Sequence, residues 1–337
     1  MTSGPAGRTR YLPWLASLAV SAALLGYLFS QIDRDELVAA ARGLHRGYLL
    51  AFMLVGLAGV LARAVRFRLL LGGSVRLRDL VAVTFARNLF IDLLPVRLGE
   101  LSYVYLLTRR IGRTVEDAFS SLLLATLFDV AAIAPLLVLA LVVVGASASS
   151  LPTGLLVALA VGLALGAAAG IRLAEPVIDR LATALVRRAP SSLGRRAGEA
   201  LARLGGALRA MRLRGGFVAV FAVSIVVRLT KFGAYYFVFL AVMSSRGFTQ
   251  ESTGFFRIFL GVASAELAAM LPVHGIAGFG TFEAAWALGF TQLGFTLQDA
   301  VISGFLAHII SQLVEYTLGG VALVWLMRPG RGALTAG

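Results

Sequence analysis

The sequence predicts an all-α polytopic membrane protein on three grounds: composition, the length of its apolar runs, and an internal repeat. Of its 337 residues, 59% are hydrophobic and 14% are charged, with a mean hydropathy of +0.87, a composition outside the range of soluble domains. Six runs are long enough to cross the roughly 30 Å of bilayer hydrocarbon as helices. They cover residues 12–30, 47–71, 117–145, 151–173, 217–243 and 298–327. We expect a single membrane domain over residues 1–337 with six full spans.

Four shorter apolar pieces form two pairs, and each pair is interrupted by a Leu-Pro-Val sequence. The pieces are residues 79–94 with 95–108, and 255–271 with 280–295. We interpret each pair as a re-entrant or short-helix hairpin, because non-helical backbone at membrane depth survives only when protein buries it or it lines a watery cavity. The alternative is that each pair forms two ordinary tilted spans, which leaves the direction of the flanking spans unchanged.

The two interruptions belong to an internal repeat. The motif LPVRLGE at 94–100 has a counterpart in the second half of the chain, LPVHGIAGFGTFE at 271–283. The segments that follow the two motifs also align, and every matching pair is separated by the same distance along the sequence. The matching pairs there are Asp117 with Asp299, Ala118 with Ala300, Ser121 with Ser303, Leu124 with Leu306 and Ala125 with Ala307, and Glu116 stands against Gln298. The sequence therefore predicts that one membrane unit occurs twice in the chain, as repeat one over 47–145 and repeat two over 217–327.

The arginine distribution predicts the orientation of these repeats. The 172–214 segment holds ten arginines against three acidic residues, which marks a cytoplasmic loop by the positive-inside rule. Further arginine clusters lie at 63–78, at 109–113 and near both termini. The connections 146–154 and 244–254 hold no arginine and one arginine, and 33–46 balances three arginines with three acidic residues. We expect a multi-pass protein of the cytoplasmic (inner) membrane with both termini in the cytoplasm. The two repeats then have opposite topology, an arrangement that places a binding site near the midplane, where the hairpins meet.

The net charge of +14 would indicate nucleic-acid binding in a soluble protein, but here the arginines collect at the ends of apolar runs. We therefore expect no nucleic-acid partner. In 174–214 the arginines alternate with Leu, Ala and Val, which is typical of a basic amphipathic helix on anionic inner-leaflet lipids. A solvated linker between the repeats is the alternative interpretation.

Several kinds of chemistry are excluded or disfavoured. Cysteine is absent, and the three histidines, His45, His274 and His308, lack metal-ligand spacing. A P-loop needs a lysine beside glycines, and the only lysine, Lys231, has none in the required positions. No nucleophile-elbow motif occurs either. We predict no metal, no cofactor and no catalytic residues.

Ionisable residues inside the apolar runs are the candidates for function, because each costs about 2.5–3.5 kcal/mol at the bilayer centre. Nine residues are candidates for binding substrate: Arg87, Arg97, Gly99, Glu100, Asp129, Lys231, Gly278, Gly280 and Glu283. A guanidinium such as that of Arg97 suits a phosphodiester, glycines let the backbone approach a headgroup, and the acids suit a cationic headgroup or coupling protons. The alternative for each charged residue is an ion pair that joins helices.

Lys231 is the only lysine among 31 lysines and arginines. A lysine at a position where arginine is otherwise used favours a compact ammonium, which can release its proton when desolvated. The alternative is a fixed ion pair with Glu266 or Glu315.

The chain resembles the lysylphosphatidylglycerol synthase transmembrane family, also called flippase-like membrane proteins, over about residues 10–327. The resemblance is carried by Arg87, the 94–100 motif, Asp129 and the 272–283 motif. The resemblance implies movement of a phospholipid or lipid-linked headgroup across the membrane, while some members carry a fused soluble synthase domain that we do not expect here. A separate synthase is then a candidate partner. Two alternatives stay open: an intramembrane transferase that uses Glu283 or Asp129 as base, and a non-transporting partner of a lipid-modifying enzyme.

Overall fold

The computed structural model describes residues 22–73, 75–94, 99–146, 176–187, 192–213, 216–268 and 276–328, with isolated positions between 162 and 170. Every regular element in these ranges is a helix, which confirms the all-α prediction. The predicted span 12–30 is described only from residue 22, where the chain is helical to residue 30, and the predicted span 151–173 lies almost wholly outside the described residues.

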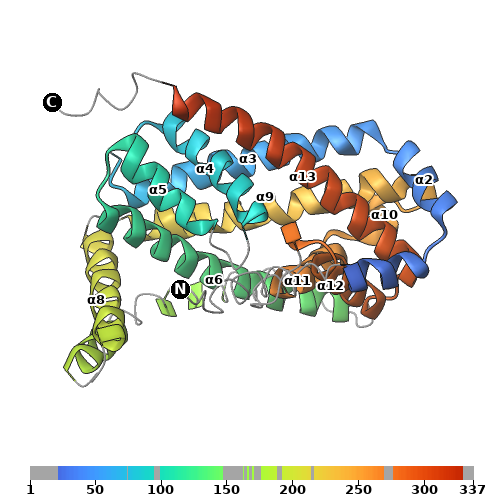
Figure 1. Ribbon diagram of the computed structural model, residues 1–337. Helices are drawn as coiled ribbons and strands as arrows, with labels where there is room; N and C mark the ends of the chain where they lie inside the picture. The colour runs from blue at the N-terminus through green and yellow to red at the C-terminus, as the bar shows by residue number, and fades with distance from the viewer. Residues whose placement is uncertain are drawn as a thin grey trace, which may run out of the picture. The chain divides into compact units, whose positions relative to one another are not determined.

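Four long helices coincide with four of the six predicted runs (Figure 1). They are α3 (Arg46–Leu70), α6 (Val115–Ala146), α9 (Phe217–Met243) and α13 (Leu297–Met327). The shortest has 25 residues, and at about 1.5 Å per residue it exceeds the hydrocarbon thickness. All four are long and apolar enough to cross a membrane. The structure therefore confirms these runs as candidate spans.

Four short helices coincide with the interrupted pieces. They are α4 (Leu77–Leu93), α5 (Glu100–Ile111), α11 (Phe255–Ala268) and α12 (Thr281–Gln292). A helix of 12 residues, the length of α5 and α12, rises only about 18 Å and cannot cross the hydrocarbon alone. The predicted interruptions are thus real ends of helices. Other elements are α2 (Arg34–Arg42), α8 (Ser192–Leu213), α10 (Gln250–Thr253) and the single turns η3 (Ser244–Arg246) and η4 (Ile276–Gly278). Residues 22–30 and 176–187 are helical as well.

The chain divides into two compact units, each assembled from separated segments. The first contains Met1–Gly56, Arg87–Leu101 and Phe232–Gly320, and the second contains Leu57–Ala86, Ser102–Lys231 and Val321–Gly337. Both interruptions, at 94–99 and 269–280, therefore belong to the first unit.

The core of the first unit is aromatic and brings α11 and α12 into close contact. The ring of Trp286 stacks on that of Phe290 at a centroid distance of 4.6 Å, and Phe239 stacks on Phe290 at 5.4 Å. Gly261 lies directly against the Phe290 ring, and the Ser264 hydroxyl lies 2.9 Å from the carbonyl oxygen of Ala285 on α12. Glycine is needed at 261 because any side chain would overlap a buried ring.

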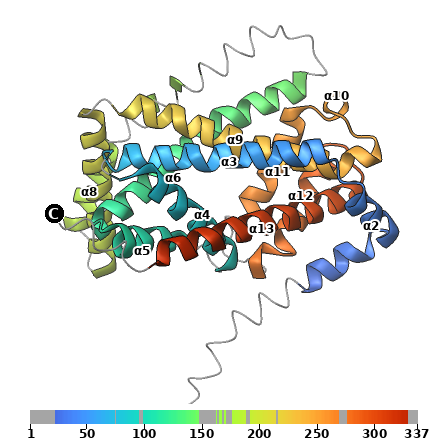
Figure 2. The same cartoon turned by 90° about the horizontal axis from the view of Figure 1, so that it is seen from above.

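The second unit has two apolar clusters that hold its helices together. The larger one packs residues of α3, α4, α5 and α6 with the end of α13, and Phe67 and Tyr103 stack at its centre with a centroid distance of 4.2 Å. The smaller one places Leu208 of α8 among Phe128, Phe217 and Phe221 of α6 and α9. Figure 2 shows α8 at the end of the chain's cartoon where α5 and α6 also lie. Helix α8 of the basic 172–214 segment is therefore docked against the start of α9 and the middle of α6.

The aligned segments at the starts of α6 and α13 have the same local hydrogen bonds. The hydroxyl of Thr114 accepts from the backbone N–H of Asp117 at 3.1 Å, and that of Thr296 accepts from the N–H of Asp299 at 3.1 Å. Threonine thus caps the start of both α6 and α13.

One turn further along each helix, a serine meets an aromatic residue of the preceding short helix. Ser121 lies 2.9 Å from the hydroxyl of Tyr103, and Ser303 accepts from the indole N–H of Trp286 at 3.1 Å. The two serines are themselves one of the aligned pairs of the repeat. The agreement in sequence therefore extends to the way each long helix binds the short helix before it.

We predict that Gly261→Ala destabilises the protein by about 1–3 kcal/mol, the usual cost of overpacking a buried site. The added Cβ would overlap the fully buried Phe290 ring. The measurement is the thermal midpoint of the detergent-solubilised protein, followed by fluorescence-detected gel filtration. Gly320→Ala is the matched control, since its Cβ would meet no atom within 4 Å. A midpoint for Gly261→Ala equal to that of the control would contradict the close packing of α11 and α12.

Candidate functional site

The interruption before α12 ends in a buried carboxylate. Glu283, in the first turn of α12, is 1% exposed, and its Oε2 accepts from the backbone N–H of Gly280 at 2.7 Å. Gly280 has φ 85° and Gly278 has φ 78°, conformations that a residue with a Cβ rarely adopts. A negative charge at this position is also favoured by the N-terminal end of the helix dipole. The structure therefore brings three candidates, Gly278, Gly280 and Glu283, together.

Two side chains of α13 complete this site. His308 Nδ1 lies 2.6 Å from Glu283 Oε1, His308 Nε2 lies 2.7 Å from the side-chain nitrogen of Gln312, and that nitrogen donates to the carbonyl oxygen of Ala277 at 2.8 Å. An amide nitrogen can only donate, so His308 accepts at Nε2 and donates from Nδ1 to the glutamate. Each polar atom in this chain of hydrogen bonds has a partner of the correct type.

The Glu283–His308–Gln312 network fixes an unusual piece of backbone. Among the residues that the structure describes, Ala277 is the one non-glycine residue with a positive φ, which is 52°. The left-handed conformation costs a residue with a Cβ about 1–2 kcal/mol, and the hydrogen bond from Gln312 holds its carbonyl in place. The network thus attaches the interruption to a long helix instead of leaving polar backbone exposed to an apolar environment.

The interruption before α5 carries an ion pair. Arg87 of α4 donates from Nε to Glu100 Oε2 at 3.0 Å and makes a second contact with the same oxygen through Nη2. The side chains are 12% and 28% exposed. A Cβ on Gly99 would overlap the backbone of Phe90 and Ile91, so glycine is required where the chain turns into α5. Arg97 lies outside the described residues, as does His274.

Asp129 forms the centre of a third cluster, in the second unit. Arg66 contacts both of its carboxylate oxygens, at 2.6 and 3.2 Å, and Arg228 Nε lies 3.3 Å from Oδ1. Ser224 accepts a further hydrogen bond from Arg66 at 3.4 Å. The Arg66 side chain is 2% exposed. One carboxylate therefore holds two guanidinium groups from α3 and α9.

Sequence reasoning missed Arg66, His308 and Gln312. Arg66 belongs to the 63–78 arginine cluster, which the positive-inside rule predicts to be a cytoplasmic loop, but it also falls inside the apolar run 47–71, and the structure places it in α3. His308 and Gln312 are four residues apart in the run 298–327, a spacing that puts both on one face of a helix. Polar residues with helical spacing inside a span were the signal that could have found them.

Lys231 stands three residues after Arg228 on α9 and is partly buried. Arg228 joins the Asp129 cluster, whereas both interpretations of Lys231, a proton-releasing ammonium or an ion pair with Glu266 or Glu315, stay predictions. Three of the candidate residues are acidic, and in the structure each of them contacts a basic side chain. They are Glu100, Asp129 and Glu283.

Apolar helices long enough to span a bilayer, with ionic groups held at helix ends, define an α-helical membrane protein. The model of the family described as lysylphosphatidylglycerol synthase TM region matches residues 14–319. The chain therefore belongs to this family, as the motifs predicted, and so to membrane proteins involved in lipid modification or translocation. None of the curated proteins compared with the chain matches it. No solved structure matches it either.

We predict that Asp129→Leu destabilises the protein by about 3–5 kcal/mol, because it leaves two buried guanidinium groups without their shared carboxylate. The thermal midpoint in detergent measures this. Asp117→Leu removes an exposed aspartate from the first turn of the same helix and serves as the control. A double variant, Arg66→Met with Asp129→Leu, should regain part of the loss, since the most deeply buried cation is then also removed. Equal midpoints for the two single variants would show that the cluster contributes little to stability.

Proposed function

We propose that this protein is a lipid translocase, which moves a phospholipid or a lipid-linked headgroup across the cytoplasmic membrane. One observation carries the proposal: the same compact unit contains two helix interruptions, and each is followed by a helix that begins with a carboxylate held by a basic side chain. These are the Glu100–Arg87 and Glu283–His308 pairs. Paired interrupted helices whose ends carry charge are typical of the binding sites of transporters.

The chemistry of the Arg87–Glu100 pair suits a zwitterionic or anionic lipid headgroup. A guanidinium binds a phosphate through two parallel donors, as it binds a carboxylate, so a phosphodiester can take the place of Glu100 on Arg87. The released Glu100 can then bind an ammonium group on the same lipid. Both side chains are partly exposed, which such an exchange requires. Arg97, Asp129 and Lys231 remain proposed contributors along the route of the headgroup.

We also propose that repeats 47–145 and 217–327 form inverted structural repeats. Three observations support this. The helices follow the same order of long, short, short and long, as α3–α4–α5–α6 and as α9–α11–α12–α13. Threonine caps and serine–aromatic contacts recur at aligned positions of the two repeats.

The third observation concerns the predicted external connections, 33–46 and 244–254. Arg246 bridges Glu36 and Asp299, and the N–H of His45 donates to the carbonyl oxygen of Ala241 at 2.9 Å. The contact of Arg246 with Glu36 supports placing both connections on one side of the membrane, as the arginine distribution predicts.

We predict that Glu283→Gln and Glu100→Gln each reduce translocation at least tenfold. Glutamine is nearly isosteric with glutamate, and at 283 it keeps an oxygen that can accept from Gly280. Both variants lose the carboxylate charge: Glu100→Gln removes the anion that Arg87 binds, and Glu283→Gln leaves a neutral amide facing His308. The assay reconstitutes purified protein in liposomes with a fluorescent phospholipid and follows the fraction accessible to a membrane-impermeant quencher. Glu116→Gln, at an exposed glutamate in the first turn of α6, is the matched control.

Gel filtration of each variant separates loss of transport from loss of fold. Wild-type rates for both variants would show that neither interruption takes part in translocation, which would sink the proposal. A wild-type protein that is folded but moves no lipid in liposomes, yet binds a lipid-modifying enzyme, would instead favour a non-transporting partner.

The inverted-repeat proposal predicts which residues an impermeant thiol reagent reaches in intact cells. The chain has no cysteine, so single substitutions report without background. Cysteine at Glu251, in α10, should be labelled from outside, and cysteine at Ala202, in α8, only after the cells are opened; both positions are exposed. External labelling at Ala202 would overturn the proposed orientation.

A further inference from the structure

The basic 172–214 segment contains a second described helix besides α8. Residues 176–187 are helical and pack on α8. Ala182 is 2% exposed, a Cβ on Gly198 would come within 2.9 Å of the Val186 backbone, and Asp179 forms an ion pair with Arg209 of α8. One face of the 176–187 helix is therefore committed to α8.

The position of α8 joins this helix pair to the end of a candidate span. Leu208 of α8 is 2% exposed among the aromatic side chains at the start of α9 and the middle of α6. Helix α8 ends at Leu213, and the candidate span α9 begins at Phe217. With α9 crossing the bilayer as proposed, a helix pair joined this closely to its end lies at the level of the headgroups.

The face of 176–187 that points away from α8 is apolar and exposed. Val177 and Leu181 are 51% and 53% exposed, and Leu185 is 37% exposed. These residues are four apart, so they form one line along the helix. An exposed apolar line beside basic residues is the arrangement by which interfacial helices enter the acyl-chain boundary.

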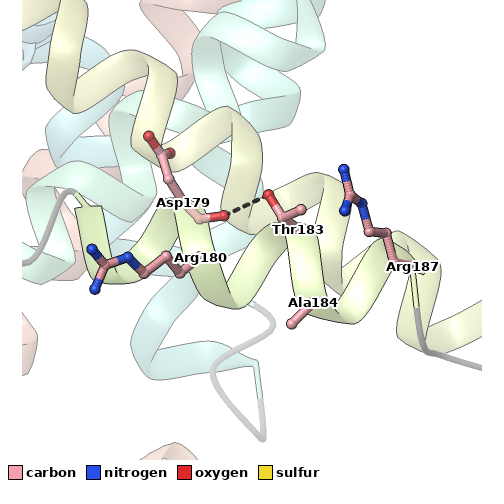
Figure 3. A pocket seen from close by; sticks show the side chains of 5 residues that line it. All are labelled: Asp179, Arg180, Thr183, Ala184 and Arg187. Atoms are coloured by element: carbon pink, nitrogen blue, oxygen red, sulfur yellow. Dashed lines mark hydrogen bonds between the residues drawn. The ribbon is translucent and has the colours of Figure 1, made fainter.

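A hollow of about 420 Å³ lies along the flank of this apolar line, and Figure 3 shows its lining. Arg180 and Arg187 stand at its two ends, with Thr183 and Ala184 between them, and Asp179 completes the lining. The carboxylate of Asp179 is engaged by Arg209, and the hydroxyl of Thr183 donates to the carbonyl oxygen of Asp179 at 2.8 Å. The two arginines therefore determine the charge of the hollow, which is positive.

We infer that this hollow binds the headgroup of an anionic phospholipid. The phosphate lies between Arg180 and Arg187, and an acyl chain of the same lipid follows Val177 and Leu181 into the leaflet. Arginine is suited to this contact because its guanidinium forms two parallel hydrogen bonds to phosphate. The long side chains can cover the two helical turns between the residues, a rise of about 10 Å. A soluble protein partner is disfavoured, since the apolar line beside the hollow lies at membrane level.

The occupant is independent of the proposed translocation, because the hollow belongs to the 176–187 helix and shares no residue with either helix interruption. It is expected to attach the basic segment to the inner leaflet. Residues 172–214 hold ten arginines and three acids, and this positive excess attracts anionic lipid to the region. The hollow then provides one defined binding position for a lipid headgroup within it.

The test uses the full-length protein in nanodiscs with a single cysteine at Ala184, labelled with an environment-sensitive dye. Ala184 lines the hollow and is exposed. The nanodiscs contain phosphatidylcholine alone or phosphatidylcholine with increasing phosphatidylglycerol. We expect a blue shift that saturates with phosphatidylglycerol, and quenching by phosphatidylglycerol that carries a quencher on its acyl chain. In the Arg180→Gln, Arg187→Gln variant the half-saturating fraction should rise roughly tenfold, as expected for two arginines at an anionic surface.

The matched control is Arg195→Gln with Arg203→Gln, which removes the same charge from exposed positions on α8. If the control raises the half-saturating fraction as much as the Arg180, Arg187 variant, the attraction is diffuse and no site exists in the hollow. A dye that fails to respond to phosphatidylglycerol, including one that responds only when a soluble protein is added, also overturns the proposal. Translocation is not the readout, so an inactive transporter leaves this result interpretable.

Discussion

The structure depends on one constraint: a backbone interrupted inside apolar sequence must have its polar groups satisfied by the protein itself. An unsatisfied buried amide or carbonyl costs several kcal/mol. Both interruptions meet this cost in the same way, with a glycine where the chain turns and an acid where the helix resumes, at Gly99 with Glu100 and at Gly280 with Glu283. The acid in turn requires a basic partner, and that requirement decides which polar residues the neighbouring helices carry.

The two interruptions differ in how completely their acid and its partner are buried. Glu283 is buried and accepts from a backbone N–H and a histidine, which is itself held by Gln312. Every hydrogen bond there has a defined donor and acceptor, so the network is stable only as a whole. The Arg87–Glu100 pair is more exposed and consists of two groups that phosphate and ammonium can each replace. For the proposed translocation, the open pair suits contact with cargo, and the closed network suits a fixed support for the second interruption.

Much of the fold could be predicted because it is decided locally. Apolar length fixes α3, α6, α9 and α13, and proline with glycine fixes the interruptions. The pairings could not be predicted, because they join residues far apart in the chain. Arg66 meets Asp129 across 63 residues and His308 meets Glu283 across 25. Tyr103 and Trp286 each stand three residues after the motif glutamate, so the repeat places them at equivalent positions, but the sequence does not show that they contact Ser121 and Ser303.

The cost of burying a charged group also explains where the excess positive charge of the protein lies. Among the described residues inside the apolar runs, the arginines that contact Asp129 and Glu100 form buried or partly buried ion pairs, because an isolated charge there is too costly. The 172–214 segment carries an excess of seven positive charges, half of the net charge of +14. In the proposed lipid contact, anionic headgroups balance part of this excess, and the exposed apolar line of the 176–187 helix faces the acyl chains.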